Sequence, residues 1–129
     1  MVRLPGVTAF YDDPDAALAR VQQDIAQAQE RAERAVEVRA SIDRVRGRAR
    51  SPRGEVDVEV DATGQLTDLV IDDAAMGLRP AELATLIRET VKAAGRDAGR
   101  RAVAVTDDAY GEGSSISTHL RDEIEARWA

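Results

Sequence analysis

Residues 51–71 read SPRGEVDVEVDATGQLTDLVI, and this stretch decides the fold. Its first four residues break a helical pattern, and acids and valines then alternate without a slip. Because successive strand residues point to opposite faces, the alternation predicts a strand with one apolar and one acidic face. A turn at residues 62–64 leads into a returning strand, where Leu69 and Ile71 are the best candidates for the core-facing side. The predicted valine face holds Val56, Val58 and Val60, and the acidic face holds Glu55, Asp57, Glu59 and Asp61.

A long helix is predicted before this hairpin. Asp13 suits an N-cap and Pro14 the first helical position, and the helical pattern continues to about Arg46. Such a helix is about 50 Å long, which one short hairpin cannot cover. Its apolar seam therefore needs another helix, for which the same helix of a second copy is the expected partner, parallel or antiparallel. The seam has spacings of three and four: Leu18, Val21, Ile25, Ala28, Ala32, Ala35, Arg39 and Ile42.

A second helix is predicted to start at Pro80, after a connector in which residues 74–76 form a short helical turn. Gly95 and Gly99 lie within this helix, where glycine costs about 1 kcal/mol relative to alanine, so close packing is the expected reason for both. Two rows follow the helical spacing. The apolar row is Leu83, Ile87, Val91, Ala94 and Ala98, and the basic row beside it is Arg88, Lys92, Arg96 and Arg100.

The C-terminal part is predicted to be a flexible polar linker over residues 103–117 followed by a short amphipathic helix. The apolar stripe of this helix is Ile116, Leu120, Ile124 and Trp128. Two interpretations stay open: the helix folds back on the body, or it docks onto another protein. The expected organisation is a flexible leader over 1–11, one domain over 12–103 and an acidic tail over 104–129.

Composition excludes several kinds of site. The 129 residues include no cysteine and one histidine, His119, which has no paired ligand nearby, so no metal site is expected. Residues 111–114 follow no strand and precede no Gly-Lys-Ser/Thr, so they are not a phosphate loop. We expect neither an enzyme nor a cofactor. No apolar run is long enough for a transmembrane helix or a signal peptide, which predicts a cytoplasmic protein.

Charge is distributed unevenly along the chain, whose net charge is −6. Residues 39–53 hold six arginines against Asp43, and residues 88–101 hold five basic residues against two acids. Residues 54–79 hold seven acids against one arginine. Because charges are screened over about 8 Å at physiological salt, a basic cluster can attract an anion despite acids elsewhere.

In order and spacing, the chain resembles the YbaB/EbfC family of nucleoid-associated DNA-binding proteins over about residues 18–102. The resemblance depends on the long first helix, on the segments SPRGEVDVEV (51–60), GQLTDLVID (64–72) and PAEL (80–83), and on VKAA (91–94). It implies an α+β protomer with a long N-terminal helix, a small antiparallel hairpin or sheet and a second helix. It also implies a homodimer joined through the sheets, which binds duplex DNA with low sequence specificity and organises the nucleoid or modulates transcription.

The family's DNA contacts lie on basic helical parts, and the resemblance carries them to basic positions of this chain. These are Arg39, Arg44, Arg46, Arg48, Arg50 and Arg53 around the end of the first helix, and Lys92, Arg96, Arg100 and Arg101 on the second. The acidic net charge and the near absence of lysine depart from this pattern. Arginine, however, contacts phosphate at least as well as lysine. The net charge, the acidic face of the hairpin and the apolar stripe from Ile116 to Trp128 support the alternative function, a protein-interaction or scaffold dimer of the same fold that has lost DNA binding.

Overall fold

The computed structural model describes residues 13–129, so the predicted leader lies outside the described residues. The chain divides into two compact units, residues 1–37 and 38–129. The first helix, α2 (Pro14–Asp43), begins as predicted, since the backbone N–H of Ala16 donates to Asp13 Oδ1 at 3.0 Å. No residue of α2 is buried. The helix ends three residues before the predicted end at Arg46, because Arg46 already belongs to a strand.

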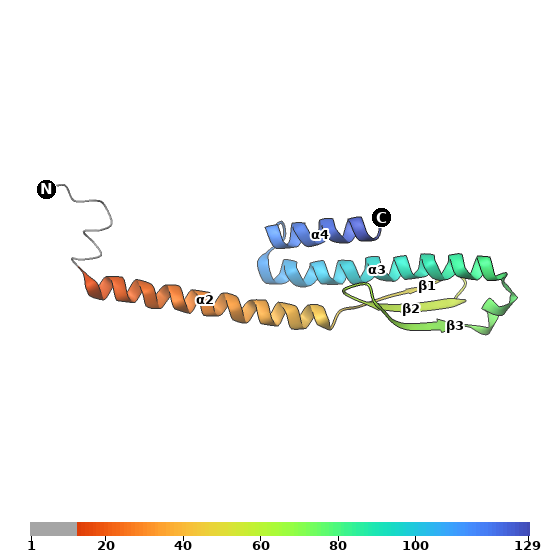
Figure 1. The fold of residues 1–129 in the computed structure, drawn as a ribbon, viewed down its shortest axis with the longest axis horizontal. Helices are drawn as coiled ribbons and strands as arrows, with labels where there is room; N and C mark the ends of the chain where they lie inside the picture. Colours follow the sequence, from red (N-terminus) through yellow and green to blue (C-terminus); the bar gives the residue numbers. More distant parts are fainter. Residues whose placement is uncertain (1–12) are drawn as a thin grey trace. The chain divides into compact units, whose positions relative to one another are not determined.

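The sheet has three antiparallel strands in the order β1-β2-β3 (Figure 1). They are β1 (Arg46–Arg50), β2 (Val56–Asp61) and β3 (Leu66–Ile71). The hairpin of β2 and β3 confirms the prediction. Strand β1 corrects it, because the prediction puts these residues at or beyond the end of the helix. The core-facing residues of β1 are only Gly47 and Ala49, so the strand shows little hydrophobic alternation.

The core lies between β1 and β2 on one side and α3 (Pro80–Tyr110) on the other. Val56, Val58 and Val60 are fully buried there, as predicted, against Ala94 and Ala98. The predicted apolar row of α3 supplies the rest of this contact, since Leu83, Ile87 and Val91 are also packed against the cluster. The predicted helical turn before α3 is the 3-10 helix η1 (Asp73–Gly77).

Helix α3 packs on β1 and β2 and leaves strand β3 largely uncovered. Leu69 pairs with Val58 and Ile71 with Val56, so both lie on the predicted valine face. They nevertheless remain 37% and 38% exposed, because α3 packs on β1 and β2. The prediction that Leu69 and Ile71 lie on the core-facing side of the sheet is correct. The expectation that they are buried is wrong within one copy of the chain.

The expected linker over residues 103–117 is wrong. Helix α3 continues to Tyr110, and a turn leads into α4 (Ser115–Arg127), which packs along α3 (Figure 1). Two buried hydroxyls explain why this polar segment folds, since Ser117 Oγ and Thr106 Oγ1 are hydrogen-bonded at 2.9 Å.

Of the two interpretations of the C-terminal helix, the one in which it folds back is correct. Side chains on or just after α4 lie directly over the two helix glycines, Trp128 at Gly95 and Ile124 at Gly99. A Cβ at either glycine would overlap these side chains, which confirms close packing as the reason for both glycines. Ile116 is the part of the stripe that stays half exposed.

Candidate nucleic-acid interface

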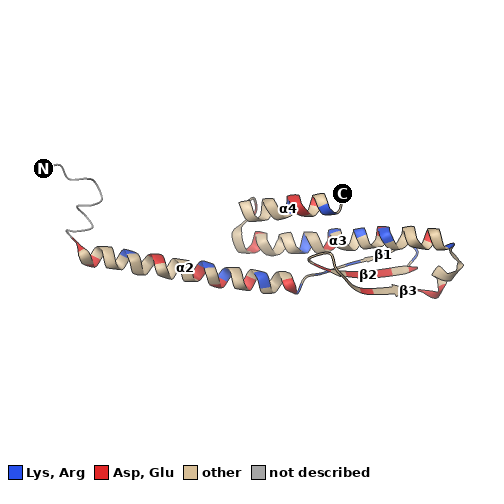
Figure 2. Ribbon diagram, viewed as in Figure 1, with Lys and Arg blue, Asp and Glu red and all other residues tan. Residues whose placement is uncertain are grey.

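The three arginines of β1 lie on the sheet face that points away from α3. Gly47 and Ala49 alternate with them and face the helix. The antiparallel register places an acid of β2 directly opposite each arginine: Arg46 pairs with Asp61, Arg48 with Glu59 and Arg50 with Asp57. The predicted acidic face is therefore shared with a row of arginines (Figure 2).

One of these cross-strand pairs is a direct ion pair. Arg48 Nη2 lies 2.7 Å from Glu59 Oε1, and Thr67 Oγ1 donates to Glu59 Oε2 at 2.8 Å. The hydrogen bond from Thr67, and then that from Arg48, holds the pKa of Glu59 below its usual value. The Arg48 side chain is still 73% exposed, so it can leave Glu59 for another anion.

The outer face of the sheet carries no positive surplus. Asp68 of β3 pairs with Glu59, which adds a fourth carboxylate beside the three arginines. A phosphate approaching this face would meet at least as many acids as bases. The β1 arginines are therefore a weaker anion-binding surface than the charge count over residues 39–53 indicates.

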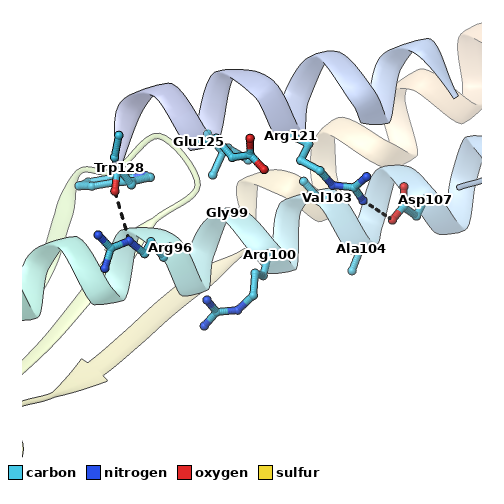
Figure 3. A pocket seen from close by; sticks show the side chains of 11 residues that line it. Arg96, Gly99, Arg100, Val103, Ala104, Asp107, Arg121, Glu125 and Trp128 are labelled. Carbon is cyan, nitrogen blue, oxygen red and sulfur yellow. Dashed lines mark hydrogen bonds and ion pairs between the residues drawn. The ribbon is translucent and has the colours of Figure 1, made fainter. Parts of the chain in front are cut away.

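Helix α3 carries the second predicted cluster, and here the basic residues outnumber the acids. Lys92, Arg96 and Arg100 are exposed and lie one turn apart. Arg96 Nε donates to the backbone oxygen of Trp128 at 3.2 Å, so its position depends on the C-terminal segment (Figure 3).

Asp97 is the acid that Arg100 and Arg101 share. It accepts from Arg101 Nε at 3.0 Å and from Arg100 Nη2 at 3.3 Å, and its Oδ2 also accepts from the backbone N–H of Arg48 at 3.0 Å. Its partial burial opposes ionisation, but the N–H of Arg48 and the side chain of Arg101 outweigh that effect and lower the pKa of Asp97. Asp97 thus ties the β1 edge to α3 and positions two of the predicted site residues.

The remaining predicted residues lie apart from both rows. Arg39 is exposed near the end of α2, and Arg44 follows the helix, where its Nη2 donates to Ser41 Oγ at 3.3 Å. Arg53 is exposed in the turn between β1 and β2. The ten basic residues therefore fall into three on β1, four on α3 with Arg101 beside the row of Lys92, Arg96 and Arg100, and three at other positions. The β1 and α3 groups are separate, because the β1 side chains point away from the helix that bears the other group.

A groove between α3 and the C-terminal segment is absent from the sequence-based prediction. It encloses about 580 Å³ and is lined by Arg96, Arg100, Val103, Asp107, Arg121 and Trp128, among others (Figure 3). Arg121 Nη2 lies 3.5 Å from Asp107 Oδ2 at one end of it. No local pattern signals this groove, because residues 103–117 have the composition of a linker.

The described residues contain neither a cluster of metal ligands nor a candidate membrane span. Within residues 13–129, no group of three or more acidic or histidine side chains is placed to hold a metal ion. Over the same residues, no helix is both long and apolar enough to cross a bilayer.

Comparison with known proteins identifies the family. No curated protein and no solved structure matches the chain significantly. The family model of the YbaB/EbfC DNA-binding family matches residues 18–113, which include most of α2, the whole sheet and α3, and end before α4. The match spans well over half of the 129 residues and agrees with the resemblance seen in the hairpin and second helix. The chain therefore belongs to the YbaB/EbfC DNA-binding family.

Proposed function

We propose that this chain is a non-enzymatic, cytoplasmic, nucleoid-associated protein that binds duplex DNA as a homodimer with low sequence specificity. The family match over residues 18–113 is the observation that carries this proposal. Exposed arginines support it, because guanidinium groups bind phosphate oxygens without reading base sequence.

Strand β3 supplies the surface that we propose for the homodimer. It is an edge of the sheet, and Leu66, Leu69 and Ile71 are 46%, 37% and 38% exposed on the face that carries the buried valines. An exposed apolar edge strand favours pairing with another chain. A second copy would complete the core that α3 leaves open over β3.

We propose the basic row of α3 as the main DNA contact. The supporting observation is the difference in charge balance: residues 88–101 hold five basic residues against two acids, whereas each β1 arginine faces a β2 carboxylate. Arg39, Arg44, Arg53 and the β1 arginines are proposed as secondary contacts. A homodimer would present two copies of each of these proposed DNA contacts.

A titration of labelled duplex DNA at several salt concentrations tests the proposal. The variant Lys92→Gln/Arg96→Gln/Arg100→Gln should bind more weakly, and the slope of log affinity against log salt should fall by about 0.9 for each phosphate that is no longer neutralised. The matched control, Arg46→Gln/Arg48→Gln/Arg50→Gln, removes the same charge from the sheet and should weaken binding less. Equal weakening in both variants would remove the preference for α3. Circular dichroism checks that Arg96→Gln leaves the fold intact.

The dimer surface has its own test. Leu69→Asp should lower the mass of the assembly in light scattering relative to the wild type, because a charge would be buried in the proposed β3 interface. Ile116→Asp on α4 is the control and should leave the oligomeric state unchanged. A wild-type monomer at micromolar concentration would refute the dimer.

A protein-interaction or scaffold dimer is the second candidate. The net charge of −6 and the carboxylates opposite the β1 arginines favour it. If the wild-type protein dimerises but fails to bind duplex DNA even at low salt, this function replaces the first.

A further inference from the structure

Helix α2 has an apolar seam whose large side chains are exposed, and none of the residues of this helix is buried. Leu18, Val21 and Ile25 are 56%, 50% and 53% exposed, although each has the seam spacing of a coiled coil. In heptad terms, Leu18, Ile25 and Ala32 occupy the a positions, and Val21, Ala28 and Ala35 occupy the d positions.

The seam is uneven along its length: its first three members are large and the next three are alanines. In a parallel pair of α2 helices, each layer would match a residue with itself, so large would meet large and alanine would meet alanine. In an antiparallel pair, Leu18 meets Ala35 of a second copy, Val21 meets Ala32, and Ile25 meets Ala28. Every layer then joins one large and one small side chain, which keeps the helix separation uniform over all six layers.

Charge complementarity selects the same arrangement. In this antiparallel register, the flanking residue Asp24 lies across from Arg31 of the second copy, and the symmetry repeats the pair. On the other flank Gln22 lies across from Gln29. In a parallel pair, the position across from Asp24 is Gln29 and that across from Arg31 is Val36, so neither ion pair can form.

Arg39 adds a reason against the parallel pair. It continues the seam at the next a position, where parallel helices would bring two guanidinium groups together. In the antiparallel register it lies beyond the last apolar layer, opposite Pro14 at the start of the other helix. We propose that α2 pairs with α2 of a second copy as an antiparallel coiled coil over residues 18–35, with Leu18 opposite Ala35.

This interface goes beyond the proposed function, because the α2 seam and the apolar surface of β3 share no residue. A subunit with two separate self-complementary surfaces links two neighbours, unless both contacts fall on the same neighbour. The α2 pair is thus an assembly contact whose removal leaves the basic row of α3 unchanged.

The absence of cysteine allows a direct test on the full-length chain. One sample carries Leu18→Cys, and a second, tagged sample carries Ala35→Cys. After mixing and mild oxidation, antiparallel pairing gives the mixed disulfide between position 18 of one copy and position 35 of the other. A parallel pair separates these positions by about 25 Å and gives only like-with-like disulfides.

The control mixes Gln23→Cys with Glu30→Cys, which lie on the outer face of the helix and should cross-link only by slow collision. Like-with-like disulfides in the seam samples, or a seam yield no higher than that of the control, would overturn the proposal. Because this readout needs no DNA, it is independent of the DNA-binding test.

A charge exchange tests the register in the same cross-linking assay. Asp24→Arg and Arg31→Asp should each reduce the mixed disulfide about two- to threefold, since each turns two attractions into repulsions at an exposed site. The double variant restores both pairs in reversed polarity, and only the antiparallel register predicts that the yield recovers. No recovery would contradict the assigned register.

Discussion

Replacing Gly47 with alanine is expected to destabilise the protein strongly, because β1 crosses α3 at this residue. A Cβ at Gly47 would overlap the carbonyl oxygen of Ala94 and the amide nitrogen of Ala98. Both atoms belong to the helix backbone, so no side-chain rotation can make room. Gly47 is what allows the edge strand to approach α3 closely enough to bury Val45 and to form the hydrogen bond from Arg48 N–H to Asp97.

The magnitude follows from two opposing effects. Overpacking a core position costs about 1 to 3 kcal/mol, and the upper end applies where the obstacle is backbone. Alanine restricts the unfolded chain more than glycine does, which raises the free energy of unfolding by about 0.4 to 1 kcal/mol. We therefore expect Gly47→Ala to lower the free energy of unfolding by about 2 to 3 kcal/mol.

Urea denaturation followed by circular dichroism measures this change. With a urea dependence of about 1 to 3 kcal/mol per molar, the midpoint should fall by about 1 to 3 M. All variants are compared at one protein concentration, since dimerisation would make stability depend on it. Gly77→Ala is the matched control, because no heavy atom lies within 4 Å of its Cβ position. If Gly47→Ala and Gly77→Ala unfold at the same urea concentration, the conclusion that β1 lies too close to α3 for a Cβ at position 47 is wrong.

Three further outcomes are expected. Trp128→Ala should lower the free energy of unfolding by about 2 kcal/mol in the same urea assay, less than for a fully buried tryptophan, because Trp128 is only partly buried; no change would mean that the C-terminal segment does not hold α4 to α3. Ser117→Ala should cost about 1 kcal/mol because its hydrogen bond to Thr106 disappears, and a neutral result would count against a buried hydroxyl pair. Asp97 has a lowered pKa in the folded state, so its stabilisation is complete above its unfolded pKa near about 4 and declines as the pH falls through the folded value. Asp97→Asn should therefore reduce the free energy of unfolding at about pH 7 and flatten its decline below about pH 4. If the decline at acid pH is the same as in the wild type, Asp97 does not hold Arg48 to α3 as proposed.

Much of the fold could be predicted because its signals are local. Alternating valines and acids fix the two faces of β2, whatever packs on them. Pro80 and the apolar row set the start and the buried side of α3, and Gly95 and Gly99 indicate a close approach before its partner is known. The family resemblance rests on the same stretches, and the family model matches them within residues 18–113.

The candidate site is harder to predict, because its residues depend on register. The sequence pattern places Arg46, Arg48 and Arg50 around a helix end, where the dipole favours cations, and they lie instead on a strand opposite three carboxylates. No local pattern marks β1 strongly, since only Gly47 and Ala49 face the core. The cancellation of its charge is a property of the pairing between two strands and of no single segment.

The sequence by itself determined which residues of β2 and α3 face a core, where α3 begins, and that α2 carries an apolar seam. Periodicity decides the faces, because a backbone of known repeat places side chains on known faces, and Pro80 marks the start of α3. Only the tertiary structure decided that β1 joins the sheet, that α4 folds back over Gly95 and Gly99, and that each β1 arginine lies opposite a β2 carboxylate. These features depend on contacts between residues distant in the sequence. A small residue such as Gly47 allows β1 to approach α3 closely but leaves no hydrophobic pattern in the sequence.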